Sequence, residues 1–248
     1  MSAAIKTASG KIVKMNSRAG AALPDVNIYR ERLWSDAQAL IERLDRHAIT
    51  PDEYIAEVRA LHHSVDMAAE LKPWIKRTLI ERKDQVLNQK TMPKKAWTMQ
   101  LLYLEPGEVH PPHHHHNLIS TQVLLHGRIY VREWDRVARL APDQILLRTR
   151  SDGWFKPGDR METTEVARNA HWFCADDKPA VILNFYIHGF QSWTFDPPGI
   201  RGRRMLDPTH GVQADGLIVA RELPLKEGHE RFGDMPIVDV PLPRHLPA

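Results

Sequence analysis

The chain has 248 residues, and its hydrophobic content of 42% is enough for one substantial core. The formal charge of +3 arises from 34 Lys and Arg against 31 Asp and Glu spread along the chain, which argues against nucleic acid as a partner. A single cysteine excludes an internal disulfide framework and is typical of a cytoplasmic protein, and no apolar run approaches the ~18 residues of a membrane span.

The first residues carry basic side chains before any acidic one. Residues 1–27 are therefore expected to form a flexible basic N-terminal arm, with a transit peptide as the alternative. Residues 28–95 follow as a helical region, because apolar side chains recur there at intervals of three and four. Thr50 and Pro51 fit a helix start, with an N-cap followed by proline at the first helical position.

From Trp97 onward the pattern changes to short alternating apolar runs separated by Pro-Gly and Asp-Gly turns. Residues 96–195 are predicted to form a β-barrel, with strands at 98–104, 120–125, 128–134, 145–150, 165–173 and 181–188. Residues 196–248 are predicted to be a Pro-rich extended tail that packs on the barrel or on a neighbour. Both flanks are expected to cover the barrel or to form a homodimer contact.

Four consecutive histidines occupy positions 113–116. Their place in mid-chain excludes a purification tag. A strand directs residues two apart to the same face, about 6.6 Å apart, so His113 and His115 can converge on one metal ion. The pair His114 and His116 is the competing register.

The spacing around these histidines resembles the first signature of the cupin superfamily. Five residues separate Gly107 from His113-x-His115, four more lead to Ser120, and six more lead to Gly127. The alternative pair misplaces the first glycine by one residue. The resemblance implies a mainly β fold, a cupin double-stranded β-helix (jelly-roll-like barrel), here with an N-terminal α-helical region and an extended C-terminal tail.

Ser120 stands where most cupins have a metal-binding glutamate, and serine is a poor ligand beside imidazoles. In the second cupin signature the last ligand is a histidine on a later strand. The resemblance assigns this place to His171 in "ARNAHWFC", although the usual Pro-x-Gly before it is missing. A core histidine bonded to backbone is the alternative. The implied metal ligands are His113, His115 and His171.

Within the cupins, the segment "LEPGEVHPPHHHHNLISTQVLLHGRIYVREWDRV" is similar to the thiol dioxygenases, the family of cysteine and cysteamine dioxygenases. The run "HWFCADDKPAVILNFYIHG" is similar to the segment around their third histidine. The likeness covers residues 100–189. It implies Fe(II), with Ni, Mn, Zn or Cu as alternative metals, and O2 with a small thiol or another anionic chelating substrate.

The relay strand of cysteine dioxygenases aligns with Asn184-x-Tyr186-x-His188. The resemblance makes Tyr186 and His188 the candidate catalytic residues, which would supply a proton or a hydrogen bond to bound oxygen. Asn184, Ser120 and Gln122 are candidates for substrate binding or support of the ligands.

A substrate carboxylate would favour an arginine. Arg168 is the residue selected for this role, from the candidates Arg128, Arg132, Arg148, Arg150 and Arg168. The run from residue 201 to 204 is interpreted as a solvated turn. His62, His63, His110 and His126 are interpreted as surface or structural, and Cys174 is expected to face away from the ligands.

The function expected from the resemblance is a non-haem Fe(II) dioxygenase that oxidises the sulfur of a small thiol to a sulfinate. One alternative is a three-histidine cupin oxygenase that cleaves a C–C bond of an enolate-type substrate, a diketone or flavonol. The other is a non-enzymatic cupin that binds a small anion through its metal. A nucleic-acid or membrane partner is not expected.

Overall fold

The computed structural model describes residues 27–64, 66–92, 95–188, 195, 202–212, 215–235 and 237–240. The arm expected at residues 1–27 therefore lies outside the described residues, except for Asn27, which begins the first helix. Among the described helices, none is long and apolar enough to cross a membrane.

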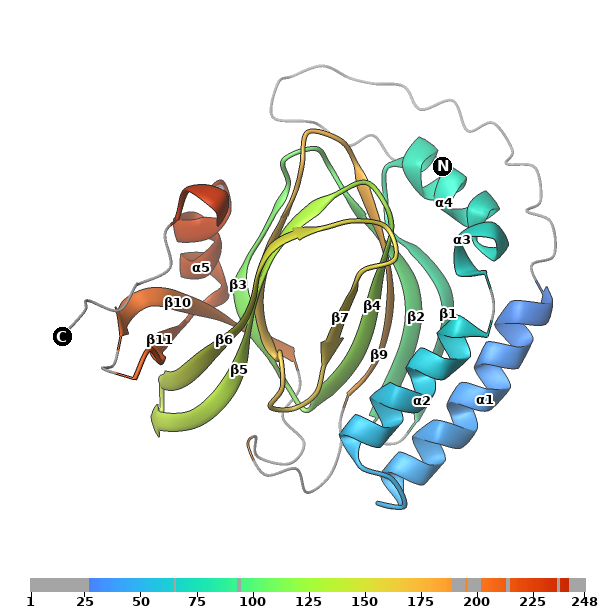
Figure 1. The fold of residues 1–248 in the computed structure, drawn as a ribbon, viewed down its shortest axis with the longest axis horizontal. Helices are drawn as coiled ribbons and strands as arrows, with labels where there is room; N and C mark the ends of the chain where they lie inside the picture. The colour runs from blue at the N-terminus through green and yellow to red at the C-terminus, as the bar shows by residue number, and fades with distance from the viewer. Residues whose placement is uncertain are drawn as a thin grey trace, which may run out of the picture.

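Four helices precede the sheets: α1 (Asn27–Asp45), α2 (Pro51–His63), α3 (Met67–Glu70) and α4 (Lys72–Glu81). Helix α2 begins at the expected N-cap, where Thr50 accepts a hydrogen bond from the Glu53 amide and the Glu53 carboxylate accepts one from the Thr50 amide. Helices α1 and α2 bury apolar side chains against the outer face of one sheet, where they join Leu101, Val123 and Phe185 in a shared core. Figure 1 shows these helices along one side of the barrel.

The predicted helical region ends earlier than expected. Strand β1 (Gln85–Met92) pairs antiparallel with β2 (Lys95–Leu104), so the last part of residues 28–95 is a strand and not a helix. Its sequence is polar and lacks a clean alternation, as an edge strand allows, because only one of its sides is paired.

Within the described residues, the nine strands β1 to β9 form two facing sheets. The first sheet has the order β1-β2-β9-β4-β7, and β3, β8, β5 and β6 are consecutive neighbours in the second. The bounds of the strands not yet given are β3 (Val109–His116), β4 (Leu118–His126), β5 (Ile129–Ala141), β6 (Gln144–Phe155), β7 (Arg160–Thr163), β8 (Ala170–Ala175) and β9 (Ala180–His188). Strands β2 to β9 thus cross repeatedly between the two sheets in the order of a jelly roll, with β5 and β6 as a hairpin in the second sheet, and the expected cupin double-stranded β-helix is confirmed.

The strand expected at 165–173 is wrong in its first half. The chain turns between β7 and β8, and Arg168 has a left-handed backbone with φ of 49°. The signature glycines also have positive φ, 71° at Gly107 and 81° at Gly127. At Gly127 a Cβ would lie 2.4 Å from the Pro179 carbonyl oxygen, so the turn after β4 requires glycine.

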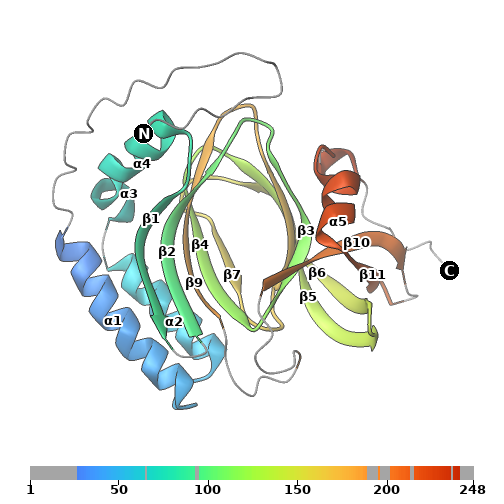
Figure 2. The same cartoon turned by 180° about the vertical axis from the view of Figure 1, so that it is seen from behind.

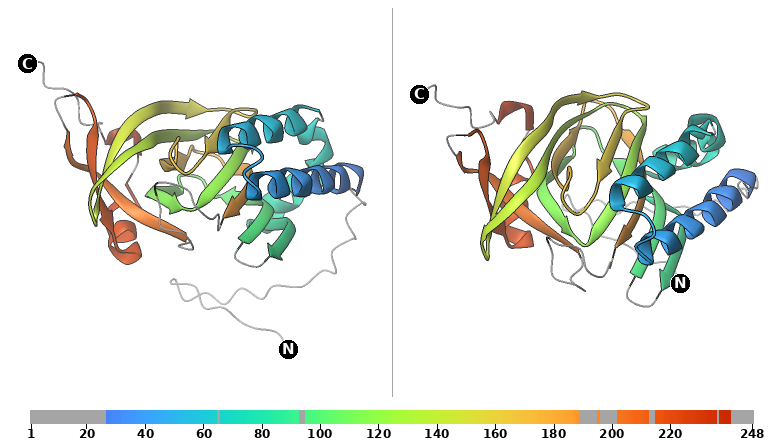
Figure 3. Two further views of the ribbon diagram at one scale, coloured as in Figure 1. Left: turned by 90° about the horizontal axis from the view of Figure 1, so that it is seen from below. Right: turned by 60° about the horizontal axis from the view of Figure 1, so that its bottom comes forward.

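The C-terminal segment is not the extended tail that was expected. Strand β10 (Gly202–Val212) pairs with β3, strand β11 (Ile218–Leu223) pairs with β10 and β6, and the second sheet thereby closes into a barrel. Helix α5 (Leu225–Phe232) and a 3-10 turn (Ile237–Asp239) follow. Figure 2 and Figure 3 show this C-terminal unit on the side of the jelly roll opposite the N-terminal helices. Pro208 and Gly211 interrupt the apolar pattern of β10 and conceal the strand in the sequence.

Candidate metal centre

Strand β3 places alternate histidines on its two faces. His113 and His115 face the space between the two sheets, and β8 brings His171 opposite His113. The ligand nitrogens of these three residues all lie within 4.8 Å of one another, and the Nε2 atoms of His115 and His171 are 3.3 Å apart. Imidazole nitrogens that converge in this way can bind one metal ion.

The tautomer of His113 is compatible with metal binding. Its Nδ1 lies 2.7 Å from the Pro111 carbonyl oxygen, which can only accept a hydrogen bond. Nδ1 must therefore carry the proton, and Nε2 keeps its lone pair. The preceding prolines, Pro111 and Pro112, lie where the pairing of β3 with β8 shifts register, and this irregularity leaves the Pro111 carbonyl free for the ring.

The electrostatic surroundings keep all three imidazoles neutral. Burial, followed by the neighbouring histidines, holds the pKa values of His113 and His115 well below their usual range. Burial also lowers the pKa of His171 to about 4. The positive charge of Arg203 contributes to each of these decreases. Neutral imidazole is the form that binds a metal, so the ligands need not lose protons near pH 7.

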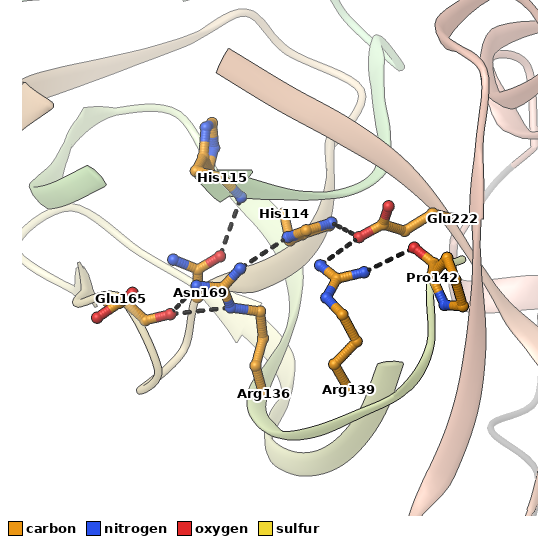
Figure 4. Close-up of polar contacts among 8 residues, drawn as sticks. All are labelled: His114, His115, Arg136, Arg139, Pro142, Glu165, Asn169 and Glu222. Carbon is orange, nitrogen blue, oxygen red and sulfur yellow. Dashed lines mark hydrogen bonds and ion pairs between the residues drawn. The ribbon is translucent and has the colours of Figure 1, made fainter. Parts of the chain in front are cut away.

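The backbone of the histidine strand is fixed by a buried asparagine. Asn169 Oδ1 accepts a 2.9 Å hydrogen bond from the His115 amide (Figure 4). Asn169 Nδ2 donates to the Thr164 carbonyl at 2.7 Å. Asn169 is fully buried. It joins the turn before β8 to β3, and so it holds the strands of His115 and His171 in a fixed relation.

The other face of β3 carries a second group with metal-ligand spacing: His114, His116 and Glu222. Figure 4 shows His114 between an arginine and a carboxylate. Arg136 Nη1 lies 3.1 Å from His114 Nδ1, and His114 Nε2 lies 2.9 Å from Glu222 Oε1, which also accepts from Arg139 at 2.8 Å. Burial lowers the pKa of His114 to about 4, so the ring is neutral.

The tautomer of His114 opposes metal binding. An arginine is always a donor, so Nδ1 of His114 accepts and the proton must lie on Nε2, where it meets Glu222. A metal at Nε2 would require an imidazolate or displacement of the buried Arg136, and two guanidinium groups add positive charge nearby. The group is a hydrogen-bond network, and the register of His113 and His115 is the one whose nitrogens are available.

A cavity of about 480 Å³ opens over the three histidines. Of the residues expected near the metal, Ser120, Gln122, Asn184 and Tyr186 all line it. His188 ends β9, but its side chain lies outside the described residues. The remaining lining residues that bear on the chemistry are Asp84, Gln100, His110 and Arg203.

Arg168 does not line this cavity, which corrects the role expected for it. Its guanidinium lies 3.6 Å from the Glu133 carboxylate, and nearly half of its side chain is exposed. The other four candidate arginines are also absent from the lining residues. Arg203 on β10 lines the cavity instead, because β10 sets it directly opposite His115. Residues 202–204 of the supposed solvated turn are thus part of a strand, and the pairing of β10 with β3 reveals their place.

Two further expectations concerned residues outside the ligand set. His110 stacks on Phe173 with ring centroids 4.6 Å apart and lines the cavity, so it is closer to the centre than its surface or structural interpretation implied. Cys174 is buried in the core beneath the C-terminal unit, on the face of β8 away from His171, as expected.

Comparisons with solved structures yield distant likenesses. No family model matches the chain, and no curated protein matches it. Among solved structures, an 11S globulin from Wrightia tinctoria is 11% identical, with a TM-score of 0.30 over 44% of this chain and 22% of the globulin. A recombinant oxalate oxidase in complex with glycolate is 14% identical, with a TM-score of 0.29 over 43% of this chain and 44% of the other.

A third structure, a double-stranded β-helix protein from Klebsiella pneumoniae, is 12% identical, with a TM-score of 0.30 over 50% of this chain and 84% of the other. The chain thus matches about a fifth of the globulin and less than half of the oxidase. Likenesses this low say nothing of function, and the fold is defined by the strand order itself.

Proposed function

We propose that the protein is a non-haem Fe(II) dioxygenase that adds both atoms of O2 to the sulfur of a small thiol, which yields a sulfinate and a proton. The observation that carries this proposal is the convergence of three neutral imidazoles at a cavity, in a ligand group that contains no carboxylate from the described residues. The resemblance of residues 100–189 to thiol dioxygenases supports the choice of sulfur.

The residues present fit a divalent metal. His113, His115 and His171 would hold it, and three uncharged ligands leave its full charge to attract a thiolate. When bound, such an ion lowers the pKa of a coordinated thiol and offers further positions for O2. Ni, Mn, Zn and Cu also accept imidazole nitrogen, so the donor set alone does not select iron.

The surrounding side chains would bind and orient the substrate. Tyr186 lines the cavity beside its cross-strand neighbour Ser120, and its phenol would donate a hydrogen bond to the reacting oxygen or sulfur. Arg203 would attract the anionic substrate, and burial lowers the pKa of its guanidinium. His110, stacked on Phe173, would limit the access of water.

The direct test is oxygen uptake by protein loaded anaerobically with Fe(II), with cysteine, cysteamine, mercaptopropionate and mercaptosuccinate as substrates. We expect at least one thiol to give O2 consumption matched by sulfinate. Replacement of His113 by Ala should abolish turnover, whereas His116→Ala, on the other face of β3, should retain it. A protein with stoichiometric iron that consumes no O2 with any thiol would refute the proposal.

The metal-dependent alternatives remain distinct in this assay. A carbon oxygenase would consume O2 with a diketone or flavonol and not with a thiol. A binding protein would consume none and would hold its anion equally well with Zn(II) or Ni(II) in place of Fe(II).

A further inference from the structure

The inner face of the first sheet changes character at the cavity. Along β2, β9 and β4, the residues Leu102, Ile182 and Leu124 form one cross-strand row, which is part of an apolar core inside the barrel. Two residues farther along each strand, the next inward row is Gln100, Asn184 and Gln122. All three of these carboxamides line the cavity of the histidines.

This carboxamide row, Gln100–Asn184–Gln122, has unmet hydrogen-bonding capacity. Gln122 is 7% exposed and Asn184 is 8% exposed, and neither Gln122 Oε1 nor Asn184 Oδ1 has a partner within the described part of the chain. The buried Ser120 Oγ beside them is also unpartnered. A buried polar atom without a partner costs about 1–3 kcal/mol, so the row is poorly suited to a merely structural role.

The chemistry of the row specifies what it can pair with. A carboxamide offers a carbonyl acceptor and an NH2 donor without net charge, and rotation about its last torsion can exchange the two. A hydroxyl or an amide of a ligand also donates and accepts hydrogen bonds, so it complements the carboxamide row. A charged group of a ligand would instead find Arg203 or Asp84, which lie outside the row on β10 and before β1.

We propose that the carboxamide row selects the ligand of this cavity: a small metal-binding anion that carries an uncharged hydroxyl or amide on its carbon skeleton. The inference rests on the proposed metal centre. It narrows the proposed substrate to a small thiol that also carries a hydroxyl or an amide. An alkyl ligand of the same size would leave the row unpaired and lose affinity, since a site built to hydrogen-bond a substrate group rejects the analogue that lacks it.

Matched pairs of ligands on Co(II)-loaded protein test this without turnover. The thiol pair is 2-mercaptoethanol and propane-1-thiol, followed by the sulfur-to-cobalt absorption. The carboxylate pair is glycolate and propionate, followed by the visible cobalt bands. Each pair differs only by a hydroxyl in place of a methyl group, and dissociation constants are measured anaerobically for all four.

We expect the hydroxyl member to bind about 10-fold more tightly in at least one pair, the size of one hydrogen bond at a buried site. Asn184→Leu and Gln122→Met should each reduce that preference to about twofold at most. Thr121→Val is the matched control, because Thr121 is a buried polar residue between Ser120 and Gln122 and pairs with Phe185 of the outer core. It should leave the preference unchanged.

Equal affinities within both pairs, or a preference that survives both variants, would overturn the proposal. Failure of all four ligands to bind cobalt-loaded protein would overturn it as well. Circular dichroism and cobalt stoichiometry identify a variant that has not folded. If Asn184→Leu or Gln122→Met fails in this way, the hydroxyl preference of the other variant tests the proposal. If thiol oxidation fails but the protein prefers glycolate and both variants lose that preference, the proposed reaction is wrong and selection by the carboxamide row stands.

Discussion

On strand β3, His113 and His115 face the cavity between the sheets, whereas His114 and His116 face the compartment closed by β10 and β11. The side chains are identical, and both pairs have a third group nearby with metal-ligand spacing. The difference lies at Nδ1: a backbone carbonyl contacts it in His113, and a guanidinium contacts it in His114. The partner of the remote nitrogen therefore decides whether a histidine can be a ligand or belongs to a structural network.

The largest expected effect comes from removing an inward histidine. His113→Ala should abolish stoichiometric metal binding. Mutation of a residue that only hydrogen-bonds to a ligand lowers metal affinity by roughly 10- to 100-fold, and loss of the ligand itself should cost more. His116→Ala should retain one metal per chain, measured by equilibrium dialysis with elemental analysis. Equal loss of bound metal in both variants would show that the two faces of β3 do not differ in metal binding as the tautomers of their histidines indicate.

The hydrogen-bond network on the other face of β3, around His114 and Glu222, can be broken at Arg136. This residue is fully buried and donates to the Glu165 carbonyl and to His114 Nδ1. Arg136→Met should lower the free energy of unfolding of the metal-free protein by about 3 kcal/mol, because it leaves both acceptors unpaired. Metal stoichiometry should be unchanged. The exposed Arg148→Met serves as control in the same urea titrations, with an expected change within about 0.5 kcal/mol.

A pH titration sharpens the comparison through Glu222. Burial opposes ionisation, but hydrogen bonds from His114 and Arg139 lower the pKa of Glu222 to about 2. Its contribution to stability is fully present above the unfolded pKa of 4.5 and is lost as the pH falls toward 2. Between pH 7 and pH 3 the loss is about 2 kcal/mol. Denaturant titrations of Glu222→Gln should lack this part of the pH dependence, and identical profiles would contradict the network.

The smallest expected effect is at Asn169, which connects the two histidine-bearing strands. Asn169→Ala should weaken metal binding by about 10-fold, because the His115 amide loses its acceptor and the ligands lose their fixed spacing. Asn169→Asp keeps an acceptor for that amide, so it should bind metal more tightly than the alanine variant. Competition with a metal chelator measures both, and equal constants for the two variants would remove Asn169 from the support of the centre.

The jelly roll and the ligand register could be predicted because local rules specify them. The spacing of Gly107 and Gly127 around the histidines reflects two backbone positions with positive φ, and it distinguishes His113 from His114 without any structure. Strand alternation then places Ser120, Gln122, Asn184 and Tyr186 on the cavity side, where the structure also has them.

The rest depends on pairings between distant segments. Arg203 lines the cavity only because β10 lies beside β3, and no local pattern in the interrupted sequence of β10 indicates that neighbour. Arg168 was the arginine expected to bind the substrate, but it lies in a left-handed turn and its guanidinium is near Glu133. Gln100 likewise belongs to the carboxamide row because β9 places Asn184 between it and Gln122, a pairing that the sequence does not indicate.

The closure of the second sheet by β10 has a consequence for how the protein is made. Residues 113–116 of β3 pair with residues 205–202 of β10. One edge of β3 therefore cannot pair until a segment about ninety residues later has been synthesised. At a typical rate of about 5–20 residues per second, that interval lasts several seconds. During synthesis, the histidines remain without their edge partner while most of the barrel is already outside the ribosome. Metal delivery is therefore expected to follow release of the C-terminal strands.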